Sequence, residues 1–193
     1  MKIKKLMALL SAMVLLALPV LAENTATEEV TDETENLFIQ IDTVTLSGEK
    51  FDMKTLEGKP LLINIWADWC SPCRHEMPVL TKLSKEYADK IAFLGLLPEG
   101  VSVENGELVI NEDRIKSALN MQEELGMGFP TLVPEELLYS LMGYTGLQAF
   151  PTTWFVSADG YLVDMAVGAM DEEGWRTKIN EVLKNLEEEN AEG

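Results

Sequence analysis

Apolar residues along this chain follow two spacings, and the change from one to the other marks the successive elements of a fold. Short apolar or alternating runs predict strands at residues 37–46, 61–66, 91–97, 129–133, 152–156 and 161–167. Apolar residues three or four positions apart predict amphipathic helices at residues 70–87, 112–125, 135–144 and 171–188. Strands that alternate with helices in this way indicate the α/β class.

Turn residues between these runs predict how neighbouring elements connect. The helix between strands 61–66 and 91–97 predicts a parallel pair joined by a right-handed crossover. Glycine-containing turns at residues 47–49, 105–106 and 159–160 predict hairpins, the first of which opens the domain. Parallel and antiparallel pairs together predict a mixed sheet, although no motif assigns a role to the segment around the middle turn.

The first 22 residues match a secretory signal peptide. Lys2, Lys4 and Lys5 precede an apolar run at residues 6–18, and cleavage is expected after Ala22. The apolar run is shorter than the roughly 20 residues that span a bilayer, which favours cleavage over a membrane anchor. We therefore expect an extracytoplasmic protein, secreted or periplasmic, while a membrane tether by an uncleaved signal stays open.

The segment after the signal is acidic. Residues 23–36 carry six acidic side chains and few apolar ones, so they predict a disordered linker. The folded domain is expected at residues 37–188, with an acidic tail at residues 189–193. The formal net charge of the 193-residue chain is −18. Because nucleic acids and anionic membranes bind clustered Lys and Arg, this charge argues against either of them as a partner.

Both cysteines of the chain lie in one short segment, three positions apart, where strand 61–66 meets the next helix. Cys70 falls at the helix start, where unpaired backbone N–H groups and the helix dipole stabilise a negative charge. The thiolate is the nucleophilic form of cysteine. We therefore predict Cys70 as a nucleophile and Cys73, one turn further into the helix, as the resolving thiol. An exported protein also places this pair where disulfides persist.

Two motifs in this chain resemble the exported TlpA/ResA branch of the thioredoxin-fold proteins. One is the run WADWCSPCRHEMP at residues 66–78, and the other is FPTTWFV at residues 150–156, followed by Asp159-Gly160. The resemblance covers residues 37–186. It implies a thioredoxin fold whose mixed central sheet is flanked by helices and extended by an N-terminal β-hairpin, and a thiol–disulfide oxidoreductase for which no cofactor is expected.

The resemblance also implies a surface that contacts the substrate. In this family a cis peptide bond precedes a proline that packs against the disulfide and offers backbone groups to an incoming chain, and Pro151 takes that position here. Trp69, Phe150 and Thr152 are its expected neighbours in substrate binding. The bulk of Phe150 is a departure that affects which partner fits.

Proton transfer at the second cysteine needs a titratable group. Many cytoplasmic thioredoxins have a buried carboxylate six residues before the nucleophile, but Asn64 stands there in this chain. The ResA-like branch places a glutamate with this role three residues after the second cysteine, which corresponds to Glu76. A solvated glutamate at the helix start is the alternative. Asn64, Ser71 and Pro72 are expected to tune the redox potential, since proline lacks an N–H.

The single histidine does not indicate a metal or haem site. Haem attachment requires a histidine directly after the second cysteine, where Arg74 stands instead. A zinc site would require further Cys or His ligands that the chain lacks. His75 is therefore predicted to be an exposed helix residue, and no metal is expected.

These features predict an enzyme that exchanges its disulfide with disulfides of extracytoplasmic proteins. The resemblance favours net reduction of exported proteins such as apocytochromes, with electrons from a membrane thiol donor of the CcdA/DsbD kind. A thiol peroxidase of the peroxiredoxin type is an alternative, although Ala67 stands where those enzymes need Thr or Ser. A non-catalytic exported domain with a structural disulfide is the other alternative.

Overall fold

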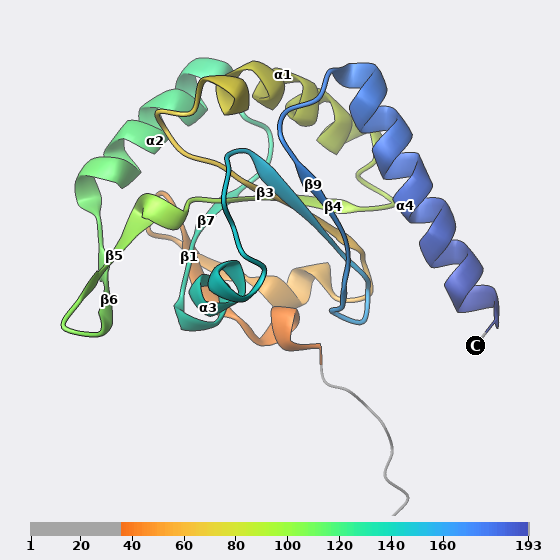
Figure 1. Ribbon diagram of the computed structural model, residues 1–193, viewed down its shortest axis with the longest axis horizontal. Helices are drawn as coiled ribbons and strands as arrows, with labels where there is room; N and C mark the ends of the chain where they lie inside the picture. Colours follow the sequence, from red (N-terminus) through yellow and green to blue (C-terminus); the bar gives the residue numbers. More distant parts are fainter. Residues whose placement is uncertain (1–35, 193) are drawn as a thin grey trace, which may run out of the picture. The chain divides into compact units, whose positions relative to one another are not determined.

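The computed structural model describes residues 36–192, and its centre is a seven-stranded sheet (Figure 1). The strands of this sheet are β1 (Asp42–Thr45), β2 (Lys50–Asp52), β3 (Leu61–Ile65), β4 (Ala92–Leu96), β7 (Thr131–Val133), β8 (Thr152–Val156) and β9 (Leu162–Val167). The α-helices are α1 (Ser71–Glu86), α2 (Glu112–Leu125), α3 (Glu136–Tyr144) and α4 (Glu172–Glu192). The expected signal peptide and residues 23–35 of the expected linker lie outside the described residues, as does Gly193.

Short 3₁₀ helices and a separate hairpin complete the described part of the chain. The 3₁₀ helices are η1 (Leu37–Gln40), η2 (Met53–Leu56) and η3 (Pro98–Gly100). The hairpin consists of β5 (Val101–Glu104) and β6 (Glu107–Ile110), which form a two-stranded sheet of their own. None of the helices in residues 36–192 is long and apolar enough to cross a bilayer.

The sheet is mixed, as predicted. Its strand order is β2-β1-β7-β4-β3-β8-β9, with β3 parallel to β4 and β4 parallel to β7. The remaining neighbours are antiparallel, and the β1–β2 and β8–β9 hairpins confirm the turns predicted from the sequence. The carboxyl end of β3 therefore lies between β4 and β8, and the chain passes from there directly into the cysteine segment.

Helices cover both faces of the sheet, which explains why every residue of β3 is buried. Alternate side chains of a strand point to opposite faces, so Leu62 and Ile63 enter different clusters. Leu62 packs in the cluster that includes buried side chains of α1, α2 and α4. Ile63 packs in the cluster that includes Leu138 and Met142 of α3. Figure 1 shows α3 apart from the other helices, in agreement with these clusters.

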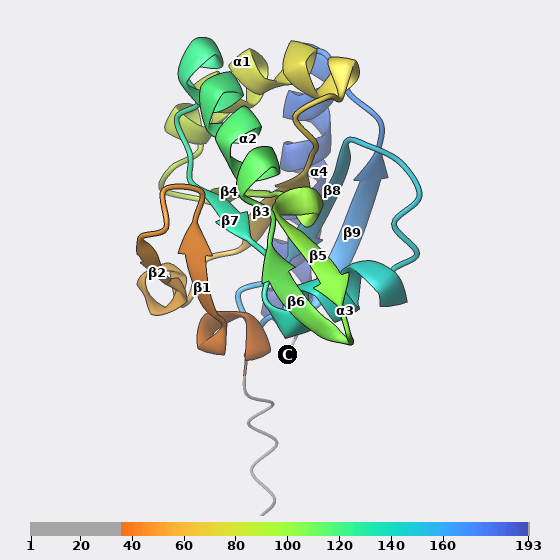
Figure 2. The ribbon, with the colours of Figure 1, turned by 90° about the vertical axis from the view of Figure 1, so that its left-hand side faces the viewer.

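The middle hairpin also follows the prediction. Asn105 and Gly106 connect β5 to β6, and both have positive φ, 51° and 88°. Two central residues with positive φ match the twist of the flanking strands, and Asn-Gly is the pair that adopts this turn most readily. Figure 2 shows the hairpin extending from the start of α2, and Figure 1 shows it to one side of the seven-stranded sheet.

The structure differs from the sequence prediction at two places near the domain ends. Residues 37–40, expected to begin a strand, form η1, because the Asn36 side chain accepts a hydrogen bond from the Phe38 N–H and caps a helical turn. Helix α4 continues to Glu192 through residues assigned to the acidic tail. No proline or glycine interrupts that stretch before Gly193, so nothing local ends the helix at residue 188.

Candidate active site

The two cysteines form a disulfide at the first turn of α1, where the sequence places them. Cys70 is the N-cap residue, and its sulfur accepts a hydrogen bond from the Cys73 N–H at 3.1 Å. Both cysteines are buried, whereas Ser71 and Pro72 between them are exposed. Proline in the first turn suits the helix start, since its missing N–H would have no partner there. When the bond is reduced, the N–H and the helix dipole favour a thiolate at Cys70.

Glu76 lies one turn after Cys73 on α1, and its side chain is only 1 % exposed. Its Oε1 accepts a hydrogen bond of 2.9 Å from the Asn64 amide. Its Oε2 accepts one of 3.2 Å from the Trp175 ring N–H and one of 3.4 Å from the Met170 N–H. A solvated glutamate, the alternative drawn from the sequence, does not fit this burial.

Burial raises the pKa of Glu76 from 4.5 to about 7, because the charged form loses its hydration. The three hydrogen bonds oppose this rise, since all of them stabilise the carboxylate: the Asn64 bond most, then those from Met170 and Trp175. A group with this pKa exists in both protonation states near neutral pH. Helix geometry places positions three apart on one face, so Glu76 and Cys73 share a face of α1.

Asn64 is fully buried on β3 and connects Glu76 to the sheet. Its Nδ2 donates to Glu76 and also to the Thr153 hydroxyl on β8, both at 2.9 Å. Its Oδ1 has no hydrogen-bond partner among the described residues. Asn64 therefore presents its donor side to the carboxylate, and Thr153 fixes that orientation.

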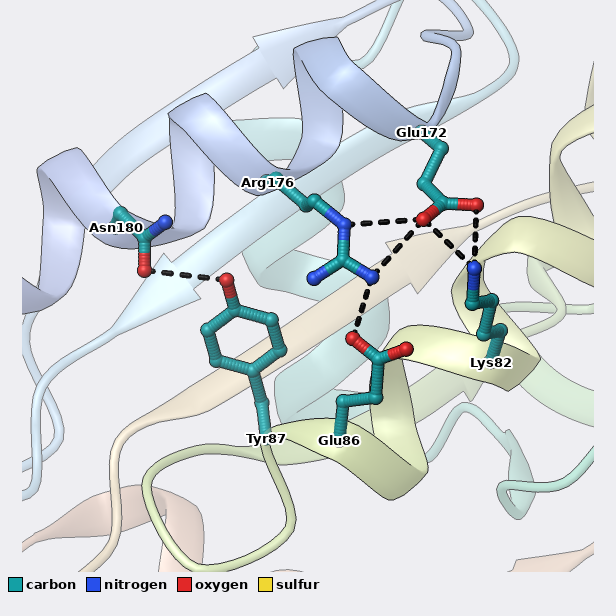
Figure 3. A network of polar contacts seen from close by, with 6 residues as sticks. All are labelled: Lys82, Glu86, Tyr87, Glu172, Arg176 and Asn180. Atoms are coloured by element: carbon teal, nitrogen blue, oxygen red, sulfur yellow. Dashed lines mark hydrogen bonds and ion pairs between the residues drawn. The ribbon is translucent and has the colours of Figure 1, made fainter.

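Helix α4 brings Trp175 to Glu76. Ion pairs also join α4 to α1 (Figure 3). Arg176 of α4 pairs with Glu86 of α1. Lys82 of α1 donates to both carboxylate oxygens of Glu172, at 2.8 and 2.9 Å. Trp175 lies within the helix predicted at residues 171–188, but hydrophobic spacing carries no information about where its ring N–H points.

The expected substrate surface lies around Trp69, whose side chain is 58 % exposed. Its ring packs edge-on against Phe150, with centroids 5.7 Å apart. The Phe150–Pro151 peptide bond is cis. Pro151 and Thr152 are buried, and the Thr152 hydroxyl donates to the Ala149 carbonyl at 2.8 Å. Trp69 and Phe150 are thus the side chains of the expected set that reach the surface.

An acidic and a basic residue outside the predicted set also reach this surface. The ring N–H of Trp69 donates to Glu99 Oε2 at 2.6 Å. Arg114 Nη1 lies 3.2 Å from both carboxylate oxygens of Asp68, and Arg114 Nε lies 3.7 Å from Glu99. Glu99 and Arg114 come from the segment around the β5–β6 hairpin, for which the sequence offered no role.

Trp66 and His75 also lie close to the cysteines in the chain. Trp66 is fully buried in the core. His75 is exposed, as predicted, and its Nδ1 lies 2.7 Å from the Ser71 carbonyl oxygen. Within residues 36–192, no three side chains of His, Cys, Asp or Glu are grouped so that they could hold a metal ion.

Comparisons with known proteins found a matching family model and similar sequences. The family model described as Redoxin matches residues 25–183. Thioredoxin-like protein YneN of Bacillus subtilis (strain 168) is 34% identical over 139 residues, which cover 70% of this chain and 72% of that protein. Thiol-disulfide oxidoreductase ResA of Bacillus thuringiensis (strain Al Hakam) is 28% identical over 138 residues, 69% of this chain and 71% of that protein.

A solved structure extends the comparison to the fold. A thiol:disulfide interchange protein of the thioredoxin family from Chlorobium tepidum TLS superposes with a TM-score of 0.59 and 24% identity. The match covers 74% of this chain and 92% of that one. It confirms the thioredoxin-like fold expected from the sequence.

Proposed function

Because this chain belongs to the Redoxin family and is a thiol–disulfide oxidoreductase of the ResA type, we propose that it reduces disulfides of extracytoplasmic proteins. The observation that carries the proposal is the pairing of a helix-capping Cys70 with a buried Glu76 whose pKa is about 7. The first favours a nucleophilic thiolate, and the second supplies a proton acceptor close to the resolving cysteine.

The reaction begins with the reduced protein. The Cys70 thiolate attacks one sulfur of the substrate disulfide, the substrate S–S bond breaks, and its other sulfur leaves as a thiolate that takes up a proton. Cys73 then loses its proton and attacks the Cys70 sulfur of the mixed disulfide. The substrate leaves with two thiols, and the protein is left with the Cys70–Cys73 disulfide, so two electrons have passed to the substrate.

Glu76 acts in the second step. Its carboxylate accepts the Cys73 proton, which makes the resolving thiol a nucleophile. Asn64 holds the carboxylate through Oε1, and Trp175 holds it through Oε2. Trp69, Phe150 and Pro151 contact the substrate chain, while Ser71 and Pro72 tune the redox potential.

Net reduction requires a dithiol donor that reopens the Cys70–Cys73 bond after each turnover. A membrane thiol protein of the CcdA/DsbD kind fits an exported reductase, and the signal-like residues 1–22 support export, with the membrane tether as the variant if they are not cleaved. Apocytochromes are one class of substrate for such a reductase. No observation favours a peroxidase, because Ala67, three residues before Cys70, has no hydroxyl.

Trapping of the mixed disulfide tests the roles proposed for the two cysteines. Reduced Cys73→Ser protein, mixed with insulin as a protein disulfide, should form a covalent adduct visible by mass spectrometry, since nothing resolves the mixed disulfide. The matched Cys70→Ser protein, which keeps only the fully buried Cys73 thiol, should form no adduct. Equal adducts from both variants, or none from either, would contradict the proposed roles.

The direction of net electron transfer is tested by the reduction potential of the Cys70–Cys73 pair. Tryptophan fluorescence in dithiothreitol buffers measures this potential. A reversible two-electron transition well below about −200 mV supports a reductant, and one near about −120 mV indicates an oxidant. A bond that stays closed until the protein unfolds would leave only a structural disulfide.

A further inference from the structure

Both ends of the β5–β6 hairpin are attached to the two residues that precede Cys70. Glu99, in η3 two residues before β5, accepts the hydrogen bond from Trp69. Arg114, in the first turn of the helix after β6, pairs with Asp68, whose side chain is 6% exposed. The hairpin is therefore fixed to the active site at its base, so a chain that lies along it has one end beside the two residues that precede Cys70.

The hairpin offers unoccupied strand edges and apolar side chains. Within residues 36–192, neither β5 nor β6 pairs with a third strand. Val103 is 53% exposed and Ile110 is 50% exposed, and the register places them on the same face of the hairpin. Exposed edges with apolar side chains are surfaces on which an extended peptide can add as a further strand.

The opposite face of the hairpin carries two acidic residues near the turn, beside Ser102 and Val109, and lacks a counter-charge. Glu104 and Glu107 are exposed and lie directly opposite each other in the register. Neither of them forms an ion pair with a residue that the structure describes, and the chain has no Lys or Arg between Lys90 and Arg114. Like charges opposite each other in a hairpin are unfavourable, and a cationic side chain placed between them relieves the repulsion.

We propose that the β5–β6 hairpin is a docking site for an extended segment of the substrate polypeptide in which apolar and basic residues alternate. The inference rests on the proposed function, since the segment must belong to the protein whose disulfide Cys70 attacks. Successive side chains of a strand point to opposite faces. The apolar residues of the segment therefore meet the face of Val103 and Ile110, and its Lys or Arg residues meet Glu104 and Glu107.

The length of the hairpin defines the length of the recognised segment. Each strand has four residues, which corresponds to roughly 13 Å of extended chain. The base of the hairpin adjoins Trp69, so the segment begins close to the substrate cysteine and covers about four residues beyond it.

Two disulfide peptides test this specificity. Each contains an intramolecular disulfide, followed by alternating valine and lysine in one peptide and alternating valine and glutamate in the other. The rate constant is measured for oxidation of the reduced protein by each peptide, using tryptophan fluorescence. We expect the lysine peptide to react about tenfold faster at low salt, and added salt to reduce the difference.

Charge reversal on the hairpin provides the decisive variant. Glu104→Lys/Glu107→Lys should slow oxidation by the lysine peptide about tenfold. Two exposed ion pairs are lost, and each contributes up to about fivefold in an equilibrium constant. Glu187→Lys/Glu189→Lys makes the same change in net charge near the end of α4, which lies on the opposite side of the molecule from the hairpin in Figure 1. An equal effect of both variants would overturn the proposal.

A neutral small disulfide separates this inference from the proposed function. Bis(2-hydroxyethyl) disulfide should oxidise wild type and both charge variants at rates within about twofold. If it fails to oxidise the wild type, the oxidoreductase function itself fails. If it reacts while the two peptides do not differ, the function stands and the docking site is wrong.

Two further outcomes concern how the segment binds. A lysine peptide with N-methylated valine amides should lose most of its advantage, because it cannot donate strand hydrogen bonds; an undiminished rate would contradict docking as a strand. A second copy of this chain is the competing occupant. If the wild type has a mass in solution larger than that of one chain, and Glu104→Lys/Glu107→Lys lowers this mass, the hairpin serves self-association instead.

Discussion

The ring N–H of Trp175 donates a 3.2 Å hydrogen bond to the carboxylate of Glu76 and so joins the last helix to the helix that carries the cysteines. Asn64 reaches the same carboxylate from the central strand. A group that three separate parts of the chain must assemble is sensitive to how those parts are packed. The protonation of Glu76 can therefore be changed without altering either cysteine.

Stability should depend on pH through Glu76. An acid whose pKa is about 7 in the folded protein and 4.5 when unfolded holds its proton more tightly in the fold. Its contribution to the free energy of unfolding is fully present below pH 4.5 and is lost as pH rises through 7. The total loss is roughly 3 kcal/mol. Glu76→Gln carries no charge at any pH. Between pH 4 and pH 8, the free energy of unfolding of this variant should therefore rise by roughly 3 kcal/mol relative to that of the wild type.

Urea unfolding of the oxidised proteins at several pH values measures this difference, and the comparison removes the contributions of the other acids. A wild-type-minus-variant difference that stays constant with pH would show that Glu76 has an ordinary pKa in the fold.

Trp175→Phe should raise the pKa of Glu76 above 7. The substitution keeps an aromatic ring in the core but removes the N–H that stabilises the carboxylate. The carboxyl carbon resonance of labelled Glu76, followed against pH, reports the shift. Trp154→Phe is the matched control, because the buried Trp154 N–H has no partner among the described residues. Equal shifts in both variants would point to altered packing rather than a lost hydrogen bond.

Gly95→Ala should destabilise the protein by about 1–3 kcal/mol. A Cβ at this position on β4 would lie 2.4 Å from the Thr131 hydroxyl oxygen and 3.0 Å from the Trp66 ring nitrogen, both in the packed interior. Thermal unfolding measures the loss. Gly143→Ala on α3 is the control, since its Cβ would meet nothing within 4 Å and alanine favours a helix. A stable Gly95→Ala protein would mean that the sheet opens there easily.

Arg114→Gln should also destabilise the protein, by about 1–3 kcal/mol, because it leaves the nearly buried Asp68 carboxylate without its cationic partner. Lys50→Gln removes an ion pair whose two side chains are 72% and 74% exposed, and its effect should be within about 0.5 kcal/mol. Chemical denaturation of the two variants at the same pH compares them. Similar losses of stability in the two variants would show that the burial of Asp68 does not strengthen its ion pair with Arg114.

Much of the fold could be predicted from the sequence, because hydrophobic spacing reports which face of each element is buried. Helix α2 and strand β8 agree with the prediction residue for residue, at 112–125 and 152–156. The error at 37–40 arose because one side-chain hydrogen bond from Asn36 decides between a strand and a 3₁₀ turn, and spacing does not register it.

The candidate site was predictable only where its residues adjoin each other in the chain. Cys70, Cys73 and Glu76 lie within two helical turns, so their relative placement follows from helix geometry. The contact of Trp175 with Glu76 joins residues 99 positions apart, and that of Glu99 with Trp69 joins residues 30 apart. Such contacts depend on tertiary packing, and local pattern does not encode them.

The short separation of the two cysteines limits how strongly the redox state influences the folding equilibrium. A disulfide stabilises a protein largely by reducing the entropy of the unfolded chain, and this effect grows with the length of the closed loop. With cysteines three positions apart, the effect is about 2 kcal/mol, against nearly 5 for a loop of about 100 residues. The protein can therefore lose and regain this bond at every turnover while the folded population stays nearly constant.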